Sequence, residues 1–327
     1  MCVPALQRLR EAVPSAHISI LARPWVGAIY EREPFCDELI PYTAPRGWKG
    51  IRDYWSVSRD LKSRNFDCAV LFQNAFEAAA LVAMAGIPER IGYDRDARGW
   101  LLTKAIAVPK RGEIALHQRS YYLELLKRAG MVHSYDASQP IRLSSASVAA
   151  EEGRKSFAAA GLRSPVVGVS PGASYGGAKR WLPDRFASAA LQVARQIEGS
   201  VAVFGSAQES DICGTVAQLV AEAGVECVNF AGTTELGQFI GMAAACAVYL
   251  TNDSGPMHIA SALGVRTVAV FGATDDIATG PTGEMSRVVK EPVECSPCLL
   301  RECPIDHRCM TRVSAEQVAA TAIDLLK

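Results

Sequence analysis

The second half of the chain alternates short, continuously apolar runs with longer stretches of helical periodicity. The apolar runs predict strands at 166–170, 200–205, 225–230, 248–251 and 266–271. The stretches between and after them predict helices at 183–197, 212–223, 236–247 and 255–263. Continuous apolar strands separated by helices are typical of a parallel sheet covered on both faces, so the predicted class is α/β.

The first half repeats this pattern less regularly. We expect strands at 17–21, 38–41, 67–72 and 90–93, and helices at 4–13, 51–64, 77–85 and 114–129. A chain of 327 residues is long enough for two domains, each with its own core. We predict an N-terminal domain over 1–150 and a C-terminal domain over 151–327. The latter closes with a helix at 315–326, whose start carries the capping-box residues Ser314 and Gln317.

Charge and hydropathy exclude several classes of protein. Lys plus Arg and Asp plus Glu both number 34, so nothing indicates a nucleic-acid surface. No apolar run reaches the roughly 18 residues of a membrane-spanning helix, and no basic stretch followed by an apolar one marks a secretory signal. We therefore expect a cytoplasmic protein without a transmembrane segment.

Three loops of the second half follow predicted strands, and open α/β sheets bind ligands where parallel strands end. The first, at 170–181, is rich in glycine and carries Ser174, Lys179 and Arg180. Glycine lets a backbone approach a ligand closely, and the two cations suit phosphate oxygens. A flexible loop with solvated charges is the alternative interpretation.

The second loop contains Gly205, Ser206 and Glu209 at the turn from a strand into a helix. Glu209 is a candidate acceptor for a ribose or a base. Close packing of strand and helix explains the glycine equally well, and solvated glutamates are common at helix starts. Taken alone, this turn is only a weak signal of a site.

The third loop, TNDSGPMH at 251–258, places a polar run directly after an apolar strand. Asp253 and Ser254 are both good N-caps for the helix that follows. The backbone N–H groups of a helix start, together with the helix dipole, favour a bound anion. His258 lies within about one turn of that start and points back towards the crevice, although a single histidine is more often structural.

These loops resemble the ADP-heptose lipopolysaccharide heptosyltransferases of glycosyltransferase family 9, in particular the heptosyltransferase II branch. The matching stretches are PGASYGGAKRWLP at 171–183, TNDSGPMHIASALG at 251–264, FQNAF at 72–76 and AGIPERIGY at 85–93. The resemblance implies a GT-B fold of two facing Rossmann-like domains. It also implies an inverting transfer of L-glycero-D-manno-heptose from an ADP-activated donor to a heptose of the lipopolysaccharide inner core.

The resemblance also implies site residues. Lys179 is expected to contact the donor diphosphate and Asp253 the heptose hydroxyls, while the backbone of Ser254 to Met257 meets diphosphate or sugar oxygens. No cofactor is required for transfer, because a lysine and a helix start can stabilise the leaving diphosphate. The full donor set is Ser174, Lys179, Arg180, Gly205, Ser206, Glu209, Asp253, Ser254, Gly255, Met257 and His258. The acceptor candidates, chosen by charge and position, are Lys104, Arg111, His117 and Arg119.

One family feature has no counterpart in the printed sequence. In the family, an aspartate after the first strand serves as general base, and that segment precedes the helix corresponding here to 4–13. The expected base therefore lies upstream of Met1. Asp37 and Asp67 lie on other elements, so no catalytic residue is assigned. General-base catalysis typically contributes 10²–10⁴-fold, so a donor-binding protein without turnover remains an alternative.

Four of the ten cysteines crowd into a short segment. Cys295, Cys298, Cys303 and Cys309, with His307, are candidate ligands of a structural metal, since a tetrahedral zinc site needs four soft ligands. A disulfide and free thiols are the alternatives. Two further functions stay open: a GT-B glycosyltransferase with another nucleotide sugar, and a metal-dependent nucleic-acid module, which the neutral charge opposes.

Overall fold

The computed structural model describes residues 1–43 and 50–327, and the chain divides into the units Met1–Gln139 and Pro140–Lys327. The division lies before the boundary that we predicted after residue 150. Residues 140–150 contact the second unit directly, because the Leu143 N–H donates to the Ala262 carbonyl at 2.8 Å. Helix α6 (Ala146–Ala159), which the sequence did not predict, then packs closely on α9 (Leu236–Ala244). Residues 140–150 therefore belong to the second unit.

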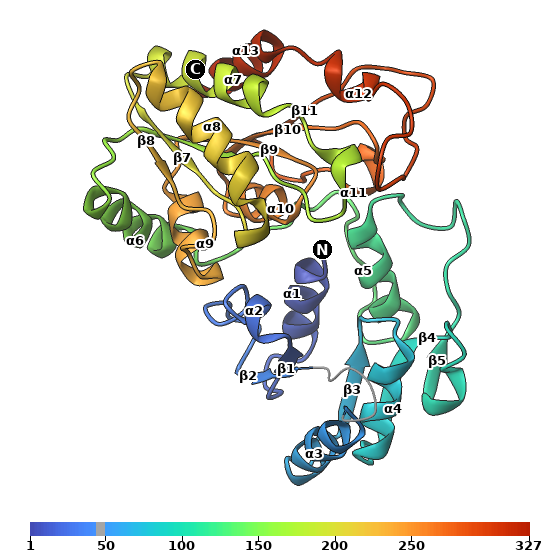
Figure 1. The fold of residues 1–327 in the computed structure, drawn as a ribbon. Coiled ribbons are helices and arrows are strands. Elements are labelled where there is room, and N and C mark those ends of the chain that lie inside the picture. The colour runs from blue at the N-terminus through green and yellow to red at the C-terminus, as the bar shows by residue number, and fades with distance from the viewer. Residues whose placement is uncertain (44–49) are drawn as a thin grey trace. The chain divides into compact units, whose positions relative to one another are not determined.

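The second unit is built on one six-stranded sheet in which all neighbouring strands are parallel (Figure 1). The strand order is β11-β10-β9-β6-β7-β8. The strands are β6 (Val166–Ser170), β7 (Ser200–Val203), β8 (Cys227–Asn229), β9 (Val248–Asn252), β10 (Arg266–Val270) and β11 (Ser286–Val289). The sequence predicted all of these except the edge strand β11.

Helices cover both faces of this sheet. On one face, α7 (Pro183–Gln196), α8 (Ser210–Glu222) and α13 (Ala315–Leu326) bury a continuous core against the strands. On the other face lie α6, α9 and α10 (Gly255–Ala262), with Met257 packed on Ala269 and Phe271. The short elements are η2 (Gly177–Lys179), η3 (Ala207–Glu209), α11 (Asp276–Thr279) and α12 (Arg308–Thr311).

In its described residues, 1–43 and 50–139, the first unit holds two smaller parallel sheets. One pairs β1 (Ser19–Ala22) with β2 (Glu38–Pro41), and the other has the order β3 (Cys68–Leu71), β4 (Glu89–Tyr93), β5 (Lys104–Ile106). Its helices are α1 (Val3–Ala12), α2 (Pro24–Gly27), α3 (Gly50–Ser63), α4 (Phe76–Met84), α5 (Gln118–Arg128) and the short η1 (Gly99–Leu101). The predicted amphipathic helix at the start is α1, which buries Ala5 and Leu9 against Leu123 and Leu126 of α5. Strand β5 was not predicted.

Candidate functional site

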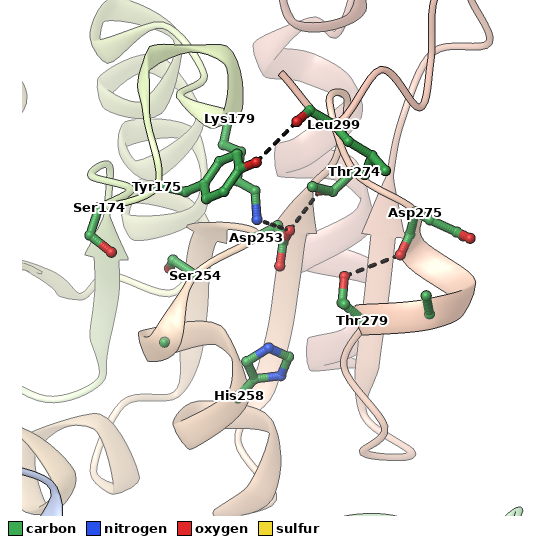
Figure 2. A pocket seen from close by; sticks show the side chains of 12 residues that line it. Ser174, Tyr175, Lys179, Asp253, Ser254, His258, Thr274, Asp275, Thr279 and Leu299 are labelled. Carbon is green, nitrogen blue, oxygen red and sulfur yellow. Dashed lines mark hydrogen bonds and ion pairs between the residues drawn. The ribbon is translucent and has the colours of Figure 1, made fainter. Parts of the chain in front are cut away.

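A pocket of about 440 Å³ opens in the second unit where β6, β9 and β10 end (Figure 2). This is the edge at which open parallel sheets bind ligands. The residues that line it are Ser174, Tyr175, Lys179, Asp253, Ser254, Gly255, His258, Thr274, Asp275, Ala278, Thr279 and Leu299. Six of them belong to the predicted donor set, so the structure brings the first and third loops together.

An ion pair between Lys179 and Asp253 lies in the wall of this pocket (Figure 2). The Lys179 Nζ is 2.6 Å from the Asp253 Oδ2, and both side chains are sheltered, at 15% and 6% exposed. The two residues are far apart in sequence, but β6 and β9 are neighbouring strands and their carboxyl ends meet. The pocket therefore places a cation and a carboxylate side by side, which suits a ligand with both anionic and hydroxyl groups.

Thr274, which follows β10, fixes the same carboxylate from the other side. Its Oγ1 donates to the Asp253 Oδ2 at 2.6 Å. Thr274 and the other lining residues that follow β10, namely Asp275, Ala278 and Thr279, were not predicted as site residues. The signal for them was present, because they come directly after a predicted strand and so had to meet the same sheet edge.

Asn252 attaches the glycine-rich loop to the end of β9. Its Oδ1 accepts from the Trp181 N–H at 3.0 Å, and its Nδ2 donates to the Pro171 and Gly172 carbonyls at 2.8 and 3.3 Å. Asn252 is fully buried and Trp181 is 1% exposed. The loop that carries Lys179 is thus held at both ends, which sequence reasoning did not predict.

The start of α10 forms the floor of the pocket. Ser254 is the N-cap, in an extended conformation and with no side-chain capping bond, while Asp253 turns instead to Lys179 and Thr274. The first N–H groups of a helix have no partner within the helix, and so they attract an anion. Gly255 and His258 also line the pocket, whereas the Met257 side chain is buried in the core behind it.

Four of the donor candidates, Arg180, Gly205, Ser206 and Glu209, do not line the pocket. The Ser206 N–H and hydroxyl both donate to the Glu209 Oε2, at 2.9 and 2.8 Å, in a capping box. A Cβ on Gly205 would lie 2.6 Å from the Cys213 sulfur, so this glycine permits close packing of strand and helix. Arg180 donates to the Ala173 carbonyl within its own loop. Their roles towards the nucleotide stay predictions.

The acceptor candidates belong to the first unit. Lys104 donates to the Ala129 carbonyl and Arg119 to the Ala137 carbonyl. Burial lowers the pKa of the Arg119 guanidinium. The His117 Nδ1 accepts from the Arg119 N–H at 3.2 Å and so caps α5, and Arg111 is exposed. The acceptor roles of all four stay predictions.

The cysteine segment joins the loop of Lys179 to the sheet. All ten cysteines are free thiols. Burial raises the pKa of the Cys309 thiol, and the nearby thiols of Cys295, Cys298 and Cys303 raise it further. The His307 Nε2 contacts the Ala178 carbonyl at 3.0 Å. Within 1–43 and 50–327, no three or more His, Cys, Asp or Glu side chains are arranged to hold a metal ion, so the structural metal stays a prediction.

Comparison with known proteins settles the family. The model of glycosyltransferase family 9 (heptosyltransferase) matches residues 54–308, which include the whole pocket. The chain belongs to glycosyltransferase family 9. It is 32% identical over 289 residues to lipopolysaccharide heptosyltransferase 2 of Escherichia coli K12, covering 86% of this chain and 81% of the relative. The resemblance stated from the sequence is thereby confirmed, and the protein is a glycosyltransferase.

Solved structures of the family share its fold. The E. coli ADP-heptose LPS heptosyltransferase II matches with a TM-score of 0.80 at 27% identity, covering 98% of this chain and 93% of that one. A family 9 glycosyltransferase from Veillonella parvula matches with a TM-score of 0.81 at 22% identity, covering 99% and 92%. The predicted α/β class with parallel sheets, of GT-B type, is confirmed. In the part of this family 9 chain that the structure describes, no helix combines the length and apolarity needed to cross a membrane.

Proposed function

We propose that this chain transfers L-glycero-D-manno-heptose from ADP-heptose to a heptose of the lipopolysaccharide inner core, with inversion at the anomeric carbon. The observation that carries the proposal is the sheltered Lys179–Asp253 pair at the start of α10, in a family 9 chain. The E. coli relative at 32% identity is named lipopolysaccharide heptosyltransferase 2, which supports the sugar and the acceptor.

The geometry suits the departure of a nucleoside diphosphate. As the glycosidic bond breaks, negative charge builds up on the leaving diphosphate, and a fixed ammonium and helix start stabilise it electrostatically. Lys179 and the N–H groups after Ser254 are the groups that we assign to this task. Asp253, held by Thr274, is assigned to the sugar hydroxyls, because a carboxylate accepts hydrogen bonds from them.

The acceptor and the place of action complete the proposal. Lipopolysaccharide precursors are anchored by lipid, so we propose that the chain works in the cytoplasm as a peripheral protein at the inner face of the inner membrane. Lys104, Arg111, His117 and Arg119 stay the candidates for contact with acceptor phosphates. No nucleic-acid partner is proposed.

The test compares donor binding and transfer in two lysine variants. In Lys179→Ala the diphosphate loses its cation, so we expect binding of ADP to weaken at least tenfold, a loss typical of a hydrogen bond to a charged group. Lys155→Ala, which removes an exposed lysine of α6, is the matched control and should bind like wild type. Affinity is measured by calorimetry and transfer by mass spectrometry of a heptosylated acceptor.

The outcomes separate the alternatives. Binding of a UDP-sugar in place of ADP would contradict the assigned donor. Binding of ADP-heptose without a heptosylated product would leave a donor-binding protein and would contradict the transferase proposal. Equal affinity for ADP in Lys179→Ala and wild type would show that this pocket is not the donor site.

A further inference from the structure

The aromatic ring of Tyr175 lies against the ammonium group of Lys179. The Lys179 Nζ is 4.9 Å from the ring centroid, within the range of a cation–π interaction. Tyr175 is 42% exposed, lines the pocket and has no place in the predicted donor set. Figure 2 shows the ring next to the lysine side chain, with its hydroxyl turned away towards Leu299.

Lys179 needs such a neighbour because a lysine side chain is flexible. Its ammonium group ends a four-carbon stem and makes non-directional contacts, so one ion pair does not fix its position. The contact with Asp253 restrains the ammonium from the side of β9, at 2.6 Å. The ring of Tyr175 contacts it from within its own loop. The lysine side chain is only 15% exposed.

The ring is itself held by the segment 295–309, which contains the four clustered cysteines and which we call the cysteine strap. The Tyr175 hydroxyl donates to the Leu299 carbonyl at 3.0 Å, and the Arg301 guanidinium lies 5.4 Å from the ring centroid. The strap is anchored in turn to the sheet edge, because the Leu299 N–H donates to the Ala273 carbonyl at 2.8 Å. The aromatic ring therefore sits between this anchored segment and the lysine side chain.

Two glycines allow the strap to approach the loop this closely. A Cβ on Gly176 would lie 2.2 Å from the Arg301 carbonyl oxygen, and one on Gly177 would lie 2.4 Å from a Glu302 carboxylate oxygen. The Gly177 N–H donates to that carboxylate, and the Ala178 N–H to the Arg301 carbonyl, at 3.0 and 2.9 Å. The loop and the strap thus form one hydrogen-bonded unit directly before Lys179.

We propose that Tyr175 is a positioning residue, which holds the Lys179 ammonium at the donor diphosphate and is itself held by the cysteine strap. Tyr175 acts through the lysine and not by direct contact with the nucleotide. The inference rests on the proposed function, because it takes the diphosphate as the group that Lys179 meets.

A double-mutant cycle with ADP as the probe tests this. Tyr175→Leu should weaken ADP binding about three- to tenfold in the wild-type background, as the loss of a cation–π contact predicts. In the Lys179→Ala background it should change the affinity by less than about twofold, because two residues that act through one contact are not additive. Tyr175→Phe keeps the ring and should restore most of the affinity.

A second measurement needs no nucleotide. Detection of the ¹⁵N-labelled lysine ammonium by NMR should give a resolved Lys179 signal in wild type and in Tyr175→Phe, and none in Tyr175→Leu. Equal losses of ADP affinity in both backgrounds would place Tyr175 on the nucleotide and overturn the inference. A Lys179 signal that persists in Tyr175→Leu would also overturn the inference. This result does not depend on nucleotide binding. If wild type fails to bind ADP, that failure refutes the proposed donor and not the role of Tyr175.

Discussion

One oxygen of the Asp253 carboxylate accepts two hydrogen bonds, and these two bonds fix the direction in which the other oxygen points. Lys179 and Thr274 both contact Oδ2, each at 2.6 Å, in a position only 5% exposed. A carboxylate oriented in this way presents its second oxygen in one direction. The hydroxyl of Thr274 therefore helps to orient the carboxylate that we propose to meet the sugar hydroxyls.

The Thr274→Val variant tests that geometry. Valine has the shape of threonine without the hydroxyl, so Asp253 keeps its charge and loses one of its two restraints. We expect kcat/KM for the donor to fall about tenfold, the size of a lost hydrogen bond to a charged group. Thr274→Ser keeps the donor and should stay within about threefold of wild type. Steady-state kinetics measure both, and identical losses in the two variants would contradict the role of the hydroxyl.

Asn252 is a residue whose contribution is to stability. Replacement by Leu leaves the buried Trp181 N–H and Pro171 carbonyl without their amide partner. Each unsatisfied buried group costs about 1–3 kcal/mol, so the loss of both bonds should lower the free energy of unfolding by about 2–6 kcal/mol. Asn229→Ala is the control, since that asparagine also ends a strand but is exposed. Urea denaturation gives both values, and equal losses would refute the attachment of the loop by Asn252.

At the scale of elements, the parallel sheet of the second unit could be predicted from its apolar strands, whereas helix α6 could not be predicted from its own residues. The buried positions of α6 are Ala149, Gly153 and Phe157, and two of these are too small to produce an apolar stripe. Its flanks looked like a domain junction because they are polar and contain glycine and proline. The small residues are explained only by α9, which lies against them.

The site shows the same limit. The loops after β6 and β9 could be predicted because a parallel sheet brings carboxyl ends of neighbouring strands together. The sequence could not predict whether Asp253 or Ser254 caps α10, because both residues suit the N-cap position. The choice depends on the contacts of Asp253 with Lys179 and Thr274, which are distant in sequence. The contacts of the cysteine strap with Tyr175 could not be predicted either, since no local sequence pattern encodes them.

The crossing of α6 and α9 can be tested at one glycine. A Cβ on Gly153 would lie 2.0 Å from the Gly241 carbonyl oxygen, so Gly153→Ala must push the helices apart. We expect a loss of about 1–3 kcal/mol, typical of overpacking. Gly214→Ala in α8 meets nothing within 4 Å and should be neutral or stabilising by up to about 1 kcal/mol. If chemical denaturation gives the same change in the free energy of unfolding for both variants, α6 and α9 do not approach each other as closely as described.

At the scale of the whole molecule, one buried thiol, Cys213, and one half-buried thiol, Cys227, make the free energy of unfolding depend on pH in the alkaline range. Burial raises the pKa of Cys213 and of Cys227 to about 12, from an ordinary value of 9.0. Between these values the unfolded chain has lost protons that the folded chain keeps. The free energy of unfolding should therefore fall as the pH rises from 9 towards 12, by up to about 1.4 kcal/mol per pH unit for each thiol.

Urea midpoints at several alkaline pH values measure this slope. Cys213→Ala removes one of the two thiols, so its stability should start lower and decline less steeply than that of wild type. An equal slope in the variant would show that this thiol does not carry the linkage.

The burial of Trp181 gives the chain an optical reporter of its own. Trp25, Trp55 and Trp100 are 63%, 58% and 76% exposed, so acrylamide should quench their emission readily. Trp181 is 1% exposed, and it is bonded through its N–H to Asn252 and through its indole to the Val313 carbonyl. Trp48 lies outside the described residues. Among the four described tryptophans, emission that resists the quencher thus reports the order of the loop that carries Lys179, and ligands could be screened against it without a labelled sugar.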